Sequence, residues 1–509
     1  MGEELIEADV VVVGGGSAGC VAARRLLDAG MRVLLLEAGG ADEHPAIHVP
    51  ARVHELWMSE VDWAYQTVAQ SDAAGRSLHW PRGKVLGGSG ALNGMIHVRG
   101  APADYDAWAY LGNAGWGWED VLPIFIAMED YDRGASPFHG VGGPLHVNTT
   151  WEPSPIAQAF RAAAEQCGIP FNEDCNDGEP DGFSYVQMTT LHGRRLNSAI
   201  AYLGPVRDHP NLTVELGGHA TSLMLERGRC VGVSFESGGR ARSARAAVEV
   251  ILAAGTIESP RLLMLSGIGP AEHLRSHGIE VAADLGGVGE NLHDHILSPV
   301  VYSAEREVGP PPPDCWAAES HLFWRSQPGL VAPDIQPIHF SAPLYESWMS
   351  GPPNGFSMLG GLVRPVSRGS LRLTSADPRS ELALDPRALS CEADVDAVEA
   401  AVKLCREMGA SAAMAQWGAR ELYPGPEVRT SAELRDYIRA TAITYHHQVG
   451  TCKMGTDEDA VVDPQLRVRG VESLRVADAS VMPTVTSGNT NAASLMIGER
   501  VAAFVAAGH

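Results

Sequence analysis

The chain has 509 residues, of which 45% are hydrophobic and 20% charged, a composition typical of a globular protein with a sizeable core. Its length predicts about two to four domain-sized units. The formal net charge of −24 at pH 7 argues against nucleic acid or an anionic lipid surface as a partner, because like charges repel. No apolar run approaches the ~18 residues of a membrane-spanning helix, so we expect no membrane span.

The cysteines and the first residues bear on the cellular compartment. The eight cysteines are scattered, and they form neither a C-x-x-C pair nor a Cys/His run with zinc-site spacing, so we expect no metal site. Residues 1–9 are acidic and lead directly into an apolar run, whereas a secretory signal starts with basic residues and a longer apolar stretch. We therefore expect a cytoplasmic protein with reduced thiols.

The clearest pattern lies in the first 40 residues. The β-branched run 8–13 predicts a strand buried in a parallel sheet, residues 17–29 predict a helix that ends at Gly30, and residues 32–36 predict a second buried strand. This βαβ unit carries Gly14-x-Gly16-x-x-Gly19 between its first strand and its helix. With Glu37 at the end of the second strand, the pattern indicates a dinucleotide-binding site.

Each residue of this fingerprint has a physical role. Gly14 allows the tight turn, Gly16 lets the backbone approach a pyrophosphate, and Gly19 lets the helix pack closely on the strand. The free N–H groups of the helix N-terminus favour phosphate. Glu37 would accept hydrogen bonds from the adenosine ribose. We also expect cofactor contacts from the neighbouring residues Ser17, Ala18 and Ala38.

The fingerprint alone does not distinguish NAD from FAD. It occurs once in the chain, which argues against transfer of electrons from NAD to a flavin. Further glycine-rich stretches at 82–93, 286–291 and 487–491 are suited to cover a long cofactor. Both features favour FAD, although glycine in each stretch is also explained by a simple loop.

The rest of the chain predicts fewer regular elements. Residues 57–143, rich in glycine and aromatics, favour irregular structure. A buried strand is predicted at 248–253, followed by a helix with Ser259 as N-cap and Pro260 in its first turn. The GPPPP run at 309–313 predicts an exposed connector. We expect an amphipathic helix at 392–408, a strand at 474–476, a loop at 478–490 and a helix at 492–507.

Several segments resemble the glucose–methanol–choline (GMC) oxidoreductase family. They are residues 82–94 (RGKVLGGSGALNG), 255–270 (GTIESPRLLMLSGIGP), 447–455 (HQVGTCKMG) and 474–483 (LRVADASVMP), together with Gly-Glu-Arg at 498–500. The match runs from end to end in consistent order and is closest to the choline dehydrogenase-like branch.

The resemblance implies a fold that is α/β, or α+β overall. A Rossmann-type FAD-binding domain would be built from the discontinuous segments 1–150, 196–295 and 446–509. Residues 151–195 and 296–445 would form a substrate-binding domain with an antiparallel sheet flanked by helices.

The resemblance also implies further cofactor contacts. Some members attach FAD covalently through a histidine directly before the asparagine that corresponds to Asn93. Leu92 occupies that position here, and because leucine cannot form the bond, we expect non-covalent FAD. Near the isoalloxazine ring or the phosphate and ribityl portion, the resemblance places Arg82, Gly87, Gly88, Asn93, Gly94, Asp478, Ala479 and Asn491.

Oxidation of an alcohol needs a base that takes the hydroxyl proton as hydride leaves the carbon, and histidine suits this role. His447 matches the catalytic base of the family, and Asn489 matches the partner that hydrogen-bonds the substrate oxygen. Adjacent strand residues point to opposite faces, so we expect His446 to face away from the flavin. The resemblance assigns His293 and His295 to structure near the FAD domain rather than to a metal.

The implied function is FAD-dependent oxidation of the CH–OH group of a small alcohol to an aldehyde or ketone. The electron acceptor would be O2 or a quinone- or dye-like molecule, a choice that the sequence leaves open. A hydroxynitrile lyase with redox-silent FAD, on the same fold, is the alternative, and a carrier that binds FAD structurally is a weaker one.

The substrate is not readable from the sequence. A choline-like quaternary amine would need an aromatic or acidic cage, and we can place none. For the aromatic residues of the implied substrate domain, core packing is an alternative to substrate contact; these are Trp316, Phe323, Trp324, Phe340, Tyr345 and Trp348.

Overall fold

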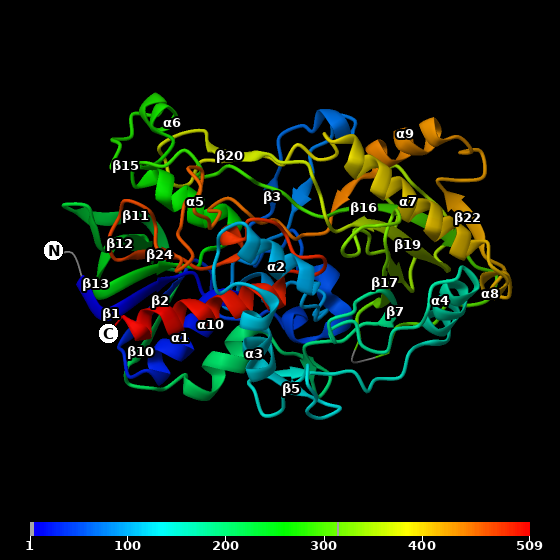
Figure 1. The fold of residues 1–509 in the computed structure, drawn as a ribbon, viewed down its shortest axis with the longest axis horizontal. Helices are drawn as coiled ribbons and strands as arrows, with labels where there is room; N and C mark the ends of the chain where they lie inside the picture. The colour runs from blue at the N-terminus through cyan, green and yellow to red at the C-terminus, as the bar shows by residue number, and fades with distance from the viewer. Residues whose placement is uncertain (1–4, 313–314, 509) are drawn as a thin grey trace.

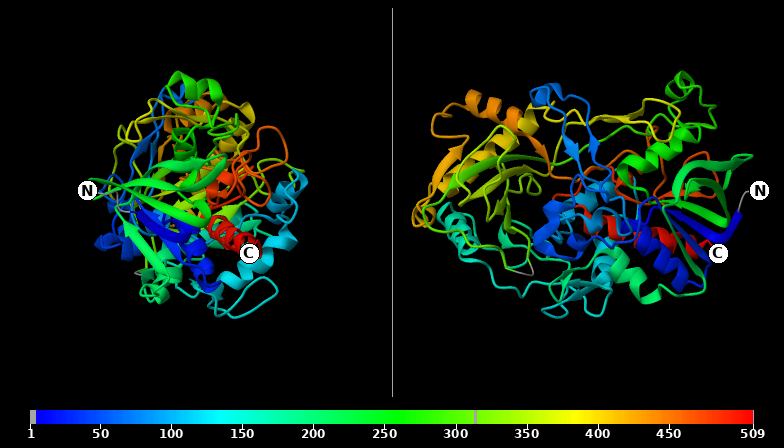
Figure 2. Two further views of the ribbon diagram at one scale, coloured as in Figure 1. Left: turned by 90° about the vertical axis from the view of Figure 1, so that its left-hand side faces the viewer. Right: turned by 180° about the vertical axis from the view of Figure 1, so that it is seen from behind.

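Two large sheets lie at opposite ends of the long axis of the protein (Figures 1 and 2). The computed structural model describes residues 5–312 and 315–508. Within these ranges each of the two sheets has seven strands. No helix in the described ranges is long and apolar enough to cross a membrane.

The first sheet contains the predicted βαβ unit. Its order is β10-β2-β1-β13-β12-β11, with β24 also paired to β13. Strands β10, β2, β1, β13 and β24 are parallel neighbours, whereas β12 and β11 continue the sheet antiparallel. The strands are β1 (Leu5–Val13), β2 (Val33–Glu37), β10 (Leu212–Leu216), β11 (His219–Glu226), β12 (Arg229–Ser237), β13 (Arg240–Leu252) and β24 (Leu474–Val476).

Helices α1 (Ser17–Asp28) and α10 (Asn491–Ala507) pack side by side beneath this sheet (Figure 1). Glycine allows α1 to pack closely against the turn after β1 and against α10. A Cβ on Gly19 would lie 1.9 Å from the carbonyl oxygen of Gly14, and a Cβ on Gly498 would lie 2.5 Å from that of Ala18. The predicted packing role of Gly19 is confirmed.

The second sheet is antiparallel, as the family resemblance implied. Its order is β22-β16-β19-β18-β17-β7, with β23 paired to β16. Helix α7 (Glu392–Gly409), predicted at 392–408, packs on β16 and β19, while α4 (Pro155–Gln166), α8 (Ala412–Ala415) and α9 (Ser431–Thr441) lie nearby (Figure 1). The strands are β7 (Gly182–Tyr185), β16 (Ile296–Ser303), β17 (Ala318–Phe323), β18 (Ile338–Phe340), β19 (Gly355–Leu362), β22 (Arg420–Tyr423) and β23 (Ile443–Thr444).

Short elements connect the two sheets. They include helices α2 (Pro102–Tyr110), α3 (Trp118–Met128) and α6 (Ala271–Ser276). The two-stranded ladders are β3 (Tyr65–Gln66) with β4 (His79–Trp80), β5 (Glu129–Tyr131) with β6 (Leu145–Val147), β8 (Thr190–Leu191) with β9 (Arg194–Arg195), β14 (Ile268–Gly269) with β15 (Ala283–Asp284), and β20 (Ser370–Leu373) with β21 (Leu382–Asp385).

The structure refines one expectation from the sequence and contradicts another. The segment 57–143 is loop-heavy as expected, but it also contains α2 and α3. Helix α5 (Gly255–Leu265) begins at Gly255 rather than after Ser259. The reason is tertiary: the Gly255 N–H and the Ser259 hydroxyl both donate to the Asp478 carboxylate, at 2.9 and 2.6 Å. The predicted connector 309–313 has no regular structure up to Pro312, and Pro313 lies outside the described residues.

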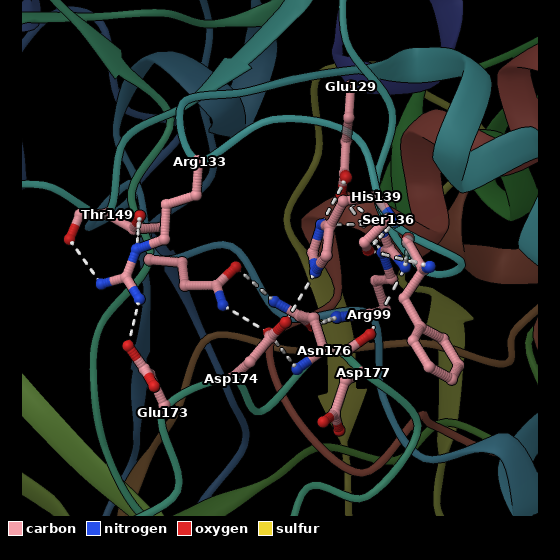
Figure 3. A network of polar contacts seen from close by, with 12 residues as sticks. Arg99, Glu129, Arg133, Ser136, His139, Thr149, Glu173, Asp174, Asn176 and Asp177 are labelled. Atoms are coloured by element: carbon pink, nitrogen blue, oxygen red, sulfur yellow. Dashed lines mark hydrogen bonds and ion pairs between the residues drawn. The ribbon is translucent and has the colours of Figure 1, made fainter.

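A buried charge cluster around Glu129 supports the segment that follows Gly94 (Figure 3). Glu129 is 1% exposed and accepts hydrogen bonds from His97 Nε2 at 2.9 Å and His139 Nδ1 at 2.8 Å, and Arg99 Nη2 lies 2.6 Å away. Burial opposes ionisation, but His139, His97 and Arg99 together hold the pKa of Glu129 well below its usual range. His139 Nε2 also bonds Asp174, at 2.9 Å. The cluster therefore holds the side chains of His97 and Arg99 in place through Glu129.

Candidate active site

A cavity of about 580 Å³ lies between the two sheets. At one end it is lined by Val13, Glu37 and Ala253, which stand at or directly after the carboxyl ends of β1, β2 and β13. In parallel α/β sheets, ligands bind at this edge. At the other end it is lined by His447 and Asn489 and by strands of the second sheet.

Most of the residues predicted as site residues line this cavity. Gly19 and Gly87 do not, because Gly19 packs against Gly14 and the Gly87 N–H donates to the carbonyl of Gly15. Those that line it are Gly14, Gly16, Ser17, Ala18, Glu37, Ala38, Arg82, Gly88, Asn93, Gly94, His447, Asp478, Ala479, Asn489 and Asn491.

Glycine backbones shape the end of the cavity near α1. Gly16 is the N-cap of α1 and provides no side-chain cap, so the first N–H groups of the helix remain available to an anion. Gly88 has φ +54°, and a Cβ there would lie 2.6 Å from the Cα of Gly16. The two loops thus meet through their backbones and leave the space above the helix N-terminus to a ligand.

Glu37 is held rigidly at the same end. Its two carboxylate oxygens accept hydrogen bonds from the Gly15 N–H at 2.9 Å and the Gly39 N–H at 2.7 Å. Burial raises the pKa of Glu37 to about 7, although these N–H groups and Lys84 oppose the shift. The carboxyl group is therefore oriented by the turn it stabilises before any ligand binds.

His447 lies at the opposite end and uses both ring nitrogens. Its Nε2 is 3.2 Å from Asn489 Nδ2 and its Nδ1 is 3.0 Å from His295 Nδ1. The backbone N–H of His447 donates to Asp294 at 2.8 Å. The Tyr445 ring stacks on the imidazole, with centroids 4.8 Å apart.

The hydrogen-bond network assigns the tautomer of His447. Asn489 Oδ1 accepts from Gln336 Nε2 at 3.3 Å, which leaves the Asn489 NH2 group to donate to His447 Nε2. The proton of His447 then sits on Nδ1 and is donated to His295. The lone pair of His447 is therefore on Nε2, where it accepts the Asn489 hydrogen bond at the cavity wall.

Burial keeps both imidazoles neutral. It lowers the pKa of His447 well below its usual value, and His295, His446 and Arg82 lower it further. Burial likewise lowers the pKa of His295 to about 3. A neutral His447 is in the state that accepts a proton.

The expectation that His446 faces away was wrong, because both His446 and His447 line the cavity. Strand β23 ends at Thr444, and His446 has φ +67°, so strand alternation does not apply. The His446 carbonyl accepts a hydrogen bond from Arg82, and its ring packs against Trp57 with centroids 5.1 Å apart.

The contact of His295 with His447 was not predicted from the sequence. The resemblance assigned His293 and His295 alike to structure near the FAD domain, but the His293 ring bonds the Asn291 carbonyl at 2.6 Å and the Val485 N–H at 3.0 Å. The sequence contains no spacing that distinguishes these two histidines. Among the described residues, no group of three or more His, Cys, Asp or Glu side chains could hold a metal ion.

Of the six aromatic candidates, only Trp316 and Phe340 line the cavity, whereas Phe323, Trp324, Tyr345 and Trp348 do not. Sequence reasoning missed several other lining residues, because a single hydrophobic residue in a buried strand or loop carries no local signal. These are Met95, Leu297, Ile338, Leu359, Ile443 and Tyr445.

Comparison with known proteins identifies the family. The chain matches GMC oxidoreductase over residues 8–297 and 365–498. It is 40% identical to the mitochondrial choline dehydrogenase of Homo sapiens, over 97% of this chain and 89% of that protein. It is also 40% identical to the oxygen-dependent choline dehydrogenase of Brucella ovis, over 97% and 95% of the two chains.

A solved structure shows the same fold. The crystal structure of pyridoxine 4-oxidase from Mesorbium loti is similar with a TM-score of 0.93 and 38% identity, over 97% of this chain and 98% of that chain. The resemblance seen in the sequence is therefore confirmed. The chain belongs to the GMC oxidoreductase family.

Proposed function

We propose that this GMC oxidoreductase binds FAD without a covalent bond and oxidises the CH–OH group of an alcohol to an aldehyde or ketone. The observation that carries the proposal is one continuous cavity. It joins the nucleotide fingerprint of β1 and α1 to a neutral imidazole, His447, that is hydrogen-bonded to a carboxamide, Asn489.

The residues present suit an adenine dinucleotide. The open N-terminus of α1 and the glycines of both loops suit the pyrophosphate, and Glu37 stands where a ribose would bind. On the flavin side we propose contacts from Arg82, Gly88, Asn93 and Gly94, with Asp478, Ala479 and Asn491 from the C-terminal segment. When bound, FAD supplies the acceptor for the hydride that leaves the alcohol carbon.

The side chains of this protein would handle the proton. A bound alcohol would take over one N–H of Asn489: the NH2 group then donates a hydrogen bond to the substrate oxygen and orients it, and the lone pair of His447 Nε2 becomes free to accept the hydroxyl proton. The His447 ring is neutral, as this role requires. His295, which accepts the Nδ1–H hydrogen bond of His447, keeps the lone pair on Nε2.

The non-covalent attachment rests on Leu92, which lines the cavity directly before Asn93. A leucine side chain has no nucleophilic atom. Acid precipitation of the holoprotein should therefore release all the flavin into the supernatant. Yellow colour that stays with the washed precipitate would contradict this part of the proposal.

The two sheets support the proposed division into domains. All the strands of the first sheet come from 1–150, 196–295 and 446–509, and all those of the second from 151–195 and 296–445. We propose that the former segments bind FAD and the latter bind the substrate. The cytoplasmic location stays a prediction.

The relatives support an alcohol as substrate and leave the acceptor open. Their names include choline dehydrogenase, oxygen-dependent choline dehydrogenase and pyridoxine 4-oxidase. We propose that the reduced enzyme passes its electrons to O2 or to a quinone- or dye-like acceptor.

The test is an anaerobic stopped-flow screen of primary, secondary and sugar alcohols that follows the flavin absorbance. A substrate should bleach the flavin, and O2 or a dye should restore it. The His447→Ala variant, loaded with flavin, should bleach about 10² to 10⁴ times more slowly. If no alcohol bleaches the flavin and a cyanohydrin releases cyanide, the enzyme is instead a lyase.

A further inference from the structure

The strands of the second sheet give the cavity one apolar wall. Leu297, Ile338, Phe340 and Leu359 line it from β16, β18 and β19 of the second sheet. These four side chains, together with Tyr445, belong to one buried hydrophobic cluster. The body of a bound alcohol would therefore lie against hydrocarbon.

The carboxylates that line the cavity are engaged elsewhere. Glu37 binds two backbone N–H groups at the end of β2. Glu258, on α5, accepts from the Tyr65 hydroxyl at 2.6 Å and from Arg261 at 2.9 Å. Asp478 caps α5. Among the described residues that line the cavity, no other Asp or Glu is found.

The formal charges nearest His447 do not favour a cation. Arg82 lines the cavity and binds the carbonyl of the adjacent His446. Asp294 does not line it, and its carboxylate accepts from the Thr444 hydroxyl, the His447 N–H and the Gln448 amide. The cationic group thus faces the cavity, whereas the anionic group is turned away and fully bonded.

The aromatic rings do not form an open cage either. Trp316 and Phe340 pack edge to face, with an angle of 85° and centroids 5.2 Å apart. The Trp316 ring also packs directly against Gly94, since a Cβ on Gly94 would lie 2.3 Å from the indole ring. Tyr445 turns one face to His447. The other aromatic rings of the lining are also engaged, since Trp57 packs against His446 and Trp63 stacks on Tyr65. A quaternary ammonium group needs free aromatic faces around it, and here each of these lining rings packs against another ring.

The unpartnered polar groups of the lining are uncharged. Three cavity-lining residues carry a buried polar atom without a hydrogen-bond partner within the described structure, namely Tyr445 (hydroxyl), Gln448 (Oε1) and His446 (Nδ1). Burial raises the pKa of Tyr445 far above its usual value, so the hydroxyl stays neutral. Such a group binds a hydroxyl, ether or ring nitrogen, and it does not neutralise a cation.

We propose that the substrate of this enzyme is an uncharged alcohol with an apolar body, and not a quaternary ammonium alcohol such as choline. A permanent cation cannot lose its charge on burial, so the apolar wall would have to accept it without a counter-ion. The inference rests on the proposed function, since it concerns the alcohol that His447 would deprotonate.

The sharpest test compares choline with 3,3-dimethylbutan-1-ol, which has the same shape with carbon in place of the charged nitrogen. We expect kcat/KM for flavin reduction to be at least about 100-fold higher for the neutral alcohol. If this pair is too small to react, 4-tert-butylbenzyl alcohol and its 4-trimethylammonio analogue make the same comparison. Equal or faster reduction by the cation would overturn the inference and leave the proposed function intact. If no alcohol reduces the flavin, the proposed function itself is wrong.

A matched pair of variants isolates the charge. Leu359→Glu and Leu359→Gln introduce side chains of nearly the same volume, and only the former is anionic. The ratio of choline to 3,3-dimethylbutan-1-ol reactivity should rise at least about tenfold in Leu359→Glu and stay level in Leu359→Gln. Bound flavin absorbance verifies that each variant has folded. An unchanged ratio in a flavin-loaded Leu359→Glu variant would count against the inference.

Asp314 needs its own control, because it precedes Trp316 closely in the chain and lies outside the described residues. The Asp314→Asn variant should keep the preference of the wild type for the neutral alcohol. Choline oxidation that depends on Asp314 would overturn the proposal.

Discussion

The Nδ1 atoms of His295 and His447 lie 3.0 Å apart in a buried environment. One ring must donate this hydrogen bond and the other must accept it. The Gln336–Asn489 amide pair on the far side of His447 selects His447 as the donor. His295 does not line the cavity. We therefore infer that it is a positioning residue, which determines which nitrogen of His447, the proposed base, carries the proton.

Replacing His295 should change which ring nitrogen of His447 carries the proton. In His295→Leu no group accepts the Nδ1 proton, so we expect kcat to fall about 10²-fold, as when a catalytic base is misoriented or in the wrong tautomer. His295→Asn places an amide oxygen near the original Nδ1 and should recover most of the loss. The measurement is the rate of flavin reduction at saturating alcohol, with flavin content as the folding control. Equal losses of rate in both variants would mean that His295 acts through packing alone.

Gly88 should be essential for cofactor binding. An alanine there would bring Cβ within 2.6 Å of the Gly16 Cα and would adopt φ +54°, so the two loops would separate at the pyrophosphate site. We expect Gly88→Ala to be purified with less than about a tenth of the wild-type flavin. Gly40→Ala is the matched control, since its Cβ meets no atom within 4 Å. Full flavin occupancy in Gly88→Ala would show that this contact is dispensable.

The Glu129 cluster should contribute far more to the free energy of unfolding than the exposed ion pair beside it in Figure 3. Glu129→Gln leaves Arg99 and His139 buried without their shared counter-ion, which we expect to cost about 3 to 5 kcal/mol of unfolding free energy. Glu173, which pairs with Arg133 at 2.7 Å, has a side chain that is 73% exposed. Glu173→Gln should cost less than about 1 kcal/mol. Urea denaturation of the flavin-loaded proteins measures both changes in unfolding free energy. Similar losses in the two variants would contradict the expected difference between the buried cluster and the exposed pair.

His139 should make this stability depend on pH. Burial lowers its pKa, but the hydrogen bonds to Asp174 and Glu129 outweigh burial, and the net pKa lies above the usual value. A raised pKa stabilises the folded state fully below the unfolded value of about 6.5, and this contribution is lost as pH rises through the folded value. The destabilisation caused by His139→Gln should therefore be larger at pH 6 than at pH 9. A loss that is independent of pH would mean that His139 is neutral.

Local patterns in the sequence determined the nucleotide-binding part of the structure. Strand β1, helix α1 and strand β2 appear where the apolar runs predict them, and the glycines and Glu37 lie at the strand ends. Helix α7 was likewise predicted, from its amphipathic spacing. These features are local: their signals are spacings of a few residues, and burial on one or both faces imposes those spacings directly.

The contacts of His447 were decided by tertiary structure alone. His295 and Asp294 both bond His447, and Asp478 caps α5. Arg82 and Thr444 hold the backbone of His446, which also lines the cavity. The apolar wall of the cavity comes from separate strands of the second sheet. Such pairings join residues far apart in the chain through packing and hydrogen bonds, and no short-range pattern of residue types encodes which distant partners will meet.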